Sequence, residues 1–175
     1  GVPTTSIGKN FVTLFCSILK KENFELVVQK TTECGISKII PIITSRTVKT
    51  GLNIERLRKI AHEASEQSGR INVPEILEPI TFAEALKNIE GEKILLDSTG
   101  KDFNSLDNFK LSTPNQSLRP GTGHAFNLFI GPEGGWTEEE IDIDKKNNFK
   151  ITSLGPLTLR GETATIIASY LVVNL

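Results

Sequence analysis

The stretch from Phe126 to Glu140, FNLFIGPEGGWTEEE, places a strand, a glycine-rich turn and a helix start in immediate succession. Its first five residues form an apolar run typical of a buried strand. Thr137, followed three residues later by Glu140, predicts a capping box that opens a helix, with Trp136 placed to pack on Ile141. A strand that passes directly into a capped helix is the repeating unit of an α/β domain.

Strand and helix patterns alternate on both sides of this stretch. Strands are predicted at 11–19, 36–43, 75–80, 93–97, 126–130 and 150–154, and helices at 24–34, 53–68, 81–88 and 162–173 as well as after 137. This order predicts an α/β fold with a mostly parallel sheet. Pro41 suggests that its strand lies at an edge or bends. The polar residues 98–123 are predicted to form a surface excursion.

Composition limits the class of protein. With 175 residues, 38% of them hydrophobic and 23% charged, the chain is expected to fold as one domain. No apolar run approaches the roughly 20 residues that cross a bilayer, and no signal peptide is evident, so we expect no membrane partner. Cys16 and Cys34 lie in apolar surroundings, which suits a reducing cytoplasm. The start at Gly1 and the lack of methionine suggest a fragment, with 1–10 as a linker or remnant.

Three strands run into loops of small residues, at 97–100, 131–135 and 155–161. Ligands of open α/β sheets gather at the carboxyl ends of strands, and glycines let the backbone approach them closely. A tight connection without a ligand explains the 131–135 loop equally well. A phosphate loop is excluded, because no Gly-Lys-Ser/Thr follows and Glu133 would repel phosphate. A carboxylate beside exposed backbone suits a ligand with hydroxyls and a positive centre.

Two further groups of polar residues are candidates for a site. Arg160 and Glu162 open the last helix, where an ion pair and simple helix capping are the structural alternatives. The helix itself is apolar nearly all round, which predicts burial or a subunit interface. Arg70 shares a helix face with charged neighbours in 63–70, and a solvated face is the alternative there. His62 and His124 lack companions at metal-ligand spacing, so no metal site is expected.

Motifs at 29–35, 45–46, 63–70, 130–140 and 153–164 occur together, and in this order the chain resembles the ribosomal small subunit methyltransferase E family. That family makes N3-methyluridine in 16S ribosomal RNA and belongs to the SPOUT superfamily. The resemblance implies a SPOUT-type α/β knot over 11–175, with a C-terminal trefoil knot, an exception to the usual absence of knots. It also implies a homodimer packed partly through the last helix. We expect the N-terminal PUA-like RNA-binding domain of that family to be absent from this chain.

The resemblance further implies S-adenosyl-L-methionine as cofactor, with S-adenosyl-L-homocysteine as product, and ribosomal RNA or the small ribosomal subunit as partner. The cofactor-binding residues it implies are Leu128, Ile130, Gly131, Glu133, Gly134, Gly135, Ser153, Leu154, Gly155, Leu159 and Arg160. Arg70 and Arg160 are expected to contact the uridine or its phosphate, and Glu133 and Glu162 to orient it or accept its proton.

One position departs from the family pattern. Leu157 and Thr158 stand where the family usually has an arginine followed by isoleucine or valine. A basic group expected to face the substrate is therefore missing. Two other functions stay open: another nucleotide-binding transferase or hydrolase using the same loops, and a catalytically silent RNA-binding or ribosome-assembly module. The net charge of −1 favours neither, since any RNA contact must come from a local patch or from a segment outside this chain.

Overall fold

A computed structural model describes residues 10–104 and 124–175. They form a seven-stranded sheet in the order β3-β2-β1-β6-β5-β7, with β4 also beside β2, and every pairing is parallel. The strands are β1 (Phe11–Ser17), β2 (Lys38–Ile43), β3 (Glu75–Ile76), β4 (Ile80–Thr81), β5 (Glu92–Asp102), β6 (Ala125–Ile130) and β7 (Lys150–Ser153). The predicted α/β fold with a mostly parallel sheet is confirmed.

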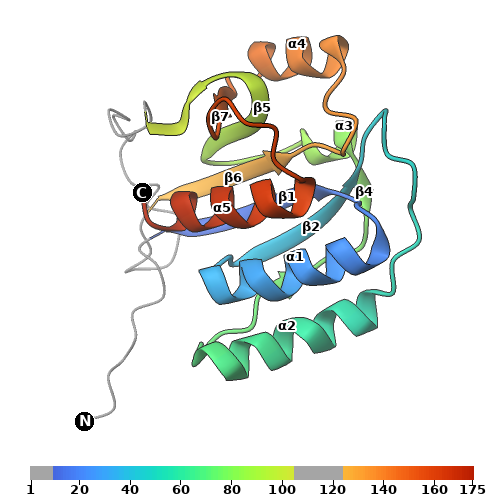
Figure 1. Ribbon diagram of the computed structural model, residues 1–175, viewed down its shortest axis with the longest axis vertical. Coiled ribbons are helices and arrows are strands. Elements are labelled where there is room, and N and C mark those ends of the chain that lie inside the picture. The colour runs from blue at the N-terminus through green and yellow to red at the C-terminus, as the bar shows by residue number, and fades with distance from the viewer. Residues whose placement is uncertain (1–9, 105–123) are drawn as a thin grey trace.

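The helices are α1 (Lys21–Cys34), α2 (Ile54–Ser68), α3 (Phe82–Ala85), α4 (Glu138–Lys146) and α5 (Gly161–Val173). Figure 1 shows α5, α1 and α2 side by side over one face of the sheet, and α1 packs against both of the others. Their core includes Val12, Leu14 and Cys16 of β1. Phe15 points to the opposite face and joins a second core with residues of α3 and the segment around α4. The alternation follows from the period of two in a strand.

The predicted helix ends are confirmed where local chemistry defines them. Gly35 ends α1 in the left-handed region at φ 107°, and the Asn53 side chain accepts a hydrogen bond from the first turn of α2. The capping boxes at Thr81 and Thr137 both form. Such contacts join residues only three or four positions apart, so the sequence is sufficient to predict them.

Two strand predictions are wrong in detail. Pro41 does not lie at an edge, because β2 pairs with β1 on one side and with β3 and β4 on the other. The outer pairing stops at Ile39 with β3 and resumes at Ile42 with β4, so the ladder is interrupted beside Pro41, which has no N–H to donate. The same gap beside Pro41 separates the strand predicted at 75–80 into the two short strands β3 and β4.

The predicted surface excursion at 98–123 is wrong at its start, because 98–102 continue β5. Thr152 of β7 pairs with Leu96 and, past an irregularity, again with Lys101, so β5 bends around it. Figure 1 shows β5 curving around β7. A Cβ atom added to Gly100 would lie 2.5 Å from the backbone of Thr152. Residues 105–123 lie outside the described part of the chain, and the trefoil knot stays a prediction.

Candidate ligand-binding site

A cavity of about 420 Å³, here called the glycine-loop pocket, opens where β6 and β7 end and where β5 bends after Leu96. Its volume falls within the roughly 300–1,000 Å³ typical of small-molecule sites. It is lined by Leu96, Asp97, Ser98, Ile130, Gly131, Pro132, Glu133, Gly134, Gly135, Trp136, Ser153, Leu154, Gly155, Pro156, Leu157, Thr158, Leu159, Gly161 and Ala164. All three loops predicted from the strand ends therefore contribute to one pocket.

The indole of Trp136 fixes one wall of this pocket. It is buried, its Nε1 donates a hydrogen bond to the carbonyl oxygen of Leu96 at 3.0 Å, and its ring lies 5.2 Å from that of Phe82. A Cβ atom on Gly131 would approach the indole to 2.9 Å, so only glycine fits against it. Gly155 on the facing loop has φ +110°, which side-chain-bearing residues rarely adopt.

Arg46 fastens the glycine loop from the end of β2. Its Nη1 donates to the carbonyl oxygens of Gly134 at 2.7 Å and Trp136 at 3.2 Å. The neighbouring Ser45 N–H donates to Oε1 of the buried Glu140, whose Oε2 accepts from the Thr137 N–H. The capped start of α4, the loop and the end of β2 thus form one hydrogen-bonded unit. Charged donors to carbonyls are among the stronger hydrogen bonds of proteins.

Most of the predicted cofactor residues line this pocket. Leu128 does not, because it is fully buried in β6 within the core beneath α1 and α5, and Arg160 does not border it either. Leu96, Trp136, Asp97 and Ser98 also line the pocket, although the sequence patterns did not indicate them as cofactor-binding residues. The run of small residues at 97–100 after an apolar strand was the signal that could have found the last two. Arg46 belongs to the 45–46 motif of the resemblance, but that motif did not indicate that its side chain binds the glycine loop.

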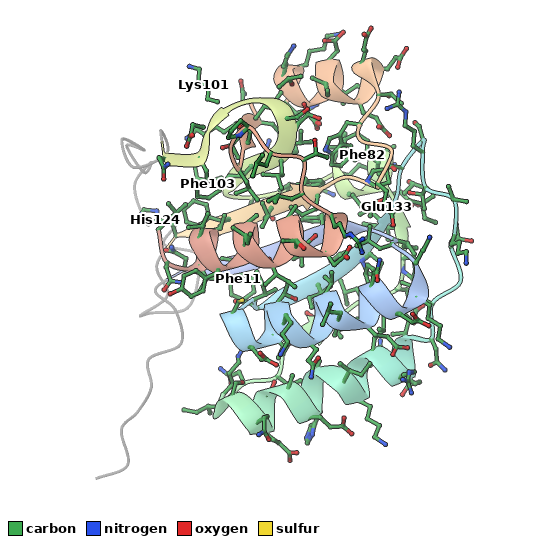
Figure 2. The ribbon with its side chains drawn as sticks, in the orientation of Figure 1. Phe11, Phe82, Lys101, Phe103, His124 and Glu133 are labelled. Atoms are coloured by element: carbon green, nitrogen blue, oxygen red, sulfur yellow. The ribbon has the colours of Figure 1, made fainter. Side chains whose placement is uncertain are left out.

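A second cavity of about 520 Å³ lies where α1 and α5 begin, and is here called the helix-end cavity. It is lined by Ile18, Leu19, Lys20, Asn23, Val48, Lys49, Glu133, Leu159, Arg160, Gly161 and Glu162. Arg160 and Glu162 are thus brought together here. Glu133, Leu159 and Gly161 line both cavities. Figure 2 shows Glu133 beside the N-terminal end of α5.

Arg70 lies elsewhere. It follows Gly69, which ends α2 with φ 72°, and its Nη1 donates to the carbonyl oxygen of Thr32 at 2.6 Å. Figure 1 shows α2 ending at the opposite edge of the sheet from the loops that follow β6 and β7. Partial burial lowers the pKa of the Arg70 guanidinium. Within one chain, Arg70 therefore joins the ends of α1 and α2 and reaches neither cavity.

Cys16 is a free cysteine buried in the core. Burial raises the pKa of the Cys16 thiol to about 12, so the thiol stays protonated at neutral pH. Across residues 10–104 and 124–175 there is no group of three or more His, Cys, Asp or Glu side chains placed to hold a metal ion. Over the same residues, none of the helices combines the length and apolar character needed to span a membrane.

A parallel sheet with a glycine-lined pocket at its strand ends defines a small-ligand-binding α/β domain, and comparison with known proteins identifies which one. Residues 8–173 match the RNA methyltransferase domain. The chain therefore belongs to that family, and its predicted resemblance to the ribosomal RNA small subunit methyltransferase E proteins is confirmed.

Particular relatives show how far the similarity extends. Ribosomal RNA small subunit methyltransferase E of Rickettsia conorii is 35% identical over 161 residues, which are 91% of this chain and 63% of that protein. The Synechocystis protein of the same name is 33% identical over 90% of this chain and 51% of its own length. A crystal structure of the Neisseria gonorrhoeae protein of that name, bound to S-adenosyl methionine, matches 95% of this chain and 67% of that one, with a TM-score of 0.79 and 29% identity. The chain thus spans about half to two thirds of these relatives.

Proposed function

We propose that this chain is the catalytic domain of an S-adenosylmethionine-dependent RNA methyltransferase that methylates N3 of a uridine in 16S ribosomal RNA. The observation that carries the proposal is the glycine-loop pocket, which is formed by the strand ends and loops of a fold shared with a relative bound to S-adenosyl methionine. The structural match to that relative covers 95% of this chain.

The residues of the pocket fit this cofactor. Glycines at 131, 134, 135 and 155 leave backbone groups open to the adenosine, and Glu133 offers a carboxylate to a ribose hydroxyl or a cationic centre. When bound, S-adenosylmethionine supplies a methyl group: its S–CH₃ bond breaks as the N3–CH₃ bond forms, and S-adenosyl-L-homocysteine remains. The loops serve to hold the two reactants in line, which supplies much of the acceleration in such a displacement.

The side chains at the border of the two cavities would handle the proton and the charge. Uracil must lose its N3 proton, and Glu133 lies between the pocket and the helix-end cavity, where a carboxylate can accept it. Arg160, in the helix-end cavity, would stabilise negative charge on the base or its phosphate, and Glu162 would orient them. N3 is hidden in a base pair, so the target is single-stranded or flipped out.

We also infer a homodimer formed partly through α5. Exposed side chains follow one face of this helix, with Ile167 39% and Tyr170 59% exposed. Large apolar groups in a row on a helix favour a protein partner over water. In such a dimer Arg70 would have to serve the partner's site, because it binds the Thr32 carbonyl and lines neither cavity of its own chain. A ribosomal RNA substrate places the reaction in the cytoplasm.

Thermal melting with different ligands tests the cofactor. We expect S-adenosylmethionine and S-adenosylhomocysteine, but not ATP, to raise the melting temperature of this chain. Stabilisation by ATP alone would favour another nucleotide-binding transferase. Transfer of a labelled methyl group by the full-length protein to 16S rRNA that lacks the modification, mapped by primer extension, tests the reaction. Cofactor binding without transfer would instead favour a silent RNA-binding module.

A further inference from the structure

The helix-end cavity shares a wall with the glycine-loop pocket. Glu133, Leu159 and Gly161 border both spaces, so a group held in one lies next to a ligand held in the other. Its volume of about 520 Å³ is sufficient for a nucleotide-sized ligand. A third cavity of about 580 Å³, between α1 and α2, shares no residue with the glycine-loop pocket.

The helix-end cavity differs in charge from the cavity between α1 and α2, here called the α1–α2 groove. The helix-end cavity is lined by three cationic side chains, Lys20, Lys49 and Arg160, against two carboxylates. None of these three forms an ion pair with any residue in the described part of the chain, so their charges are available to a ligand. The groove instead carries four glutamates against Arg56, which pairs with Glu25 at 2.6 Å. A polyanion is therefore attracted to the helix-end cavity and repelled by the groove.

The remaining lining suits a pyrimidine base. Asn23 presents an amide that both donates and accepts hydrogen bonds, as the O2, N3–H and O4 edge of uracil requires. Val48, which is 92% exposed, and Leu159 supply apolar surface for the face of the base, whereas Ile18 and Leu19 line the cavity but are almost fully buried. α1 begins after Lys20 and α5 after Arg160, and neither start is capped by a side chain, which adds partial positive charge to that of the lysines and the arginine.

We propose that the helix-end cavity receives the acceptor nucleotide of a single-stranded RNA, with Lys20 and Lys49 binding its phosphates and Asn23 recognising the uracil edge. This assignment rests on the function proposed above, since it needs a methyl donor in the adjoining pocket. It places the N3 proton of the base on the side of Glu133, the residue common to both cavities.

Fluorescence anisotropy with a labelled oligouridine at low salt, without cofactor, tests the phosphate contacts. Replacing Lys20 and Lys49 together by alanine should weaken binding about tenfold and reduce the salt dependence by roughly one to two phosphate contacts. The matched control replaces Lys145 and Lys146 of α4, which are also exposed, and should leave binding nearly unchanged. Equal losses in the two double variants, or no binding by the unaltered chain, would overturn the assignment.

A second comparison tests the base contact and separates the two proposals. The unaltered chain should prefer oligouridine to oligocytidine several-fold, and Asn23→Ala should remove that preference; an unchanged preference in the variant contradicts the role of Asn23. Calorimetric titration with S-adenosylmethionine should give the same affinity for all of these variants. If the unaltered chain binds oligouridine but not S-adenosylmethionine, the proposed function fails while the RNA contacts stand. If it binds only the cofactor, the acceptor site fails.

Discussion

The guanidinium of Arg46 lies 2.7 Å from the carbonyl oxygen of Gly134, and this hydrogen bond joins the end of β2 to the glycine loop. The two residues are 88 positions apart in sequence, so the loop depends on a remote strand for its position. The same nitrogen donates a second hydrogen bond to the carbonyl oxygen of Trp136. Arg46 thus holds the segment 134–136 at its first and its last residue. Arg46 therefore holds the shape of the pocket without lining it.

Replacing Arg46 by alanine should weaken the binding of S-adenosylmethionine about tenfold, because the loop loses two charged hydrogen bonds worth roughly 1.5–3 kcal/mol each at most. Calorimetric titration measures the affinity, and thermal unfolding measures stability. Arg58→Ala is the matched control, since Arg58 donates in the same way to the Ile76 carbonyl oxygen of β3, away from the pocket. Arg58→Ala should lower stability to a similar extent and leave the affinity unchanged; equal losses of affinity would contradict a role for Arg46 in the pocket.

Gly100→Ala should destabilise the fold by roughly 3 kcal/mol or more, because its Cβ would lie 2.5 Å from the Thr152 backbone, which cannot yield as a side chain can. Denaturant unfolding followed by circular dichroism measures the change. Gly51→Ala is the control: a Cβ there meets nothing within 4 Å, and its stability should stay within about 0.5 kcal/mol of the unaltered chain. A mild effect of Gly100→Ala would show that β5 can separate from β7 at little cost.

The Arg46–Gly134 hydrogen bond and the close approach of Gly100 to Thr152 join distant parts of the chain, and the sequence did not predict either of them. The capping box of Thr137 and Glu140 is predictable because both residues belong to one helical turn. The course of β5 beyond Asp97 is not, because its second half is largely exposed and polar and lacks the apolar alternation that indicates a strand. An edge position for Pro41 was wrong because the preference of proline for sheet edges considers one strand at a time. It does not account for two short partner strands, β3 and β4, that leave a gap beside Pro41.

Some features of the candidate site were predictable from the sequence and others were not. Loops that follow strands were predicted to meet at one edge, since all parallel strands end there, and the glycine-loop pocket confirms this for the loops after β6 and β7, whereas the predicted loop at 97–100 is part of β5. The separation of Arg70 from both cavities follows from the predicted parallel sheet, because a helix that connects two parallel strands runs back along them and ends at the edge opposite the strand-end loops; the expected contact of Arg70 with the substrate came from the resemblance alone. Arg160 lies in the helix-end cavity because the start of α5 is next to the start of α1, a long-range arrangement that the sequence patterns do not indicate.

Asp144 predicts a pH dependence of stability. Its carboxyl is fully buried in α4, no described group forms a hydrogen bond with it, and burial, with a smaller contribution from Glu140, raises its pKa from 3.8 to about 7. Between these two pKa values the unfolded chain loses the proton and the folded one keeps it, so this residue makes stability fall as pH rises from about 4 to 7. Above that range the penalty is constant.

Asp144→Asn should therefore stabilise the chain at pH 8, on the order of 1–3 kcal/mol, and the gain should shrink as the pH approaches 4. Denaturant unfolding at a series of pH values measures it. Asp142→Asn, in the same helix but exposed beside Lys145, is the control and should leave the pH profile unchanged. A gain that does not vary with pH would show that Asp144 is already neutral throughout or acts through packing alone.

The exposed face of α5 predicts an effect on the oligomeric state. Ile167→Asp should convert the proposed homodimer to monomers, since it places a charge in an apolar interface. Sedimentation velocity at several protein concentrations measures the change. Ile143→Asp in α4 is closely matched, because Ile143 is 40% exposed and Ile167 39%. It should have no effect on assembly; dissociation by both variants, or a monomeric unaltered chain, would place the interface elsewhere or exclude it.

Leu157 offers a direct test of the missing basic group. Its side chain is 79% exposed at the border of the glycine-loop pocket, so an arginine there has room and should change stability by no more than about 0.5 kcal/mol. One added cationic contact to an RNA phosphate should strengthen oligouridine binding by a few-fold at low salt and make it more salt-dependent.

Leu26→Arg adds the same charge on α1, in the wall of the α1–α2 groove, and separates a local contact from a change in net charge. We expect Leu157→Arg to increase both oligouridine affinity and the rate of methyl transfer by the full-length protein, and Leu26→Arg to increase neither. The affinity for S-adenosylmethionine should be equal in the two variants, because pocket backbone rather than the Leu157 side chain is expected to hold it. If Leu157→Arg strengthens binding without affecting the rate, the RNA phosphate is close to this position but the reacting base is already correctly placed by Arg160 and its neighbours.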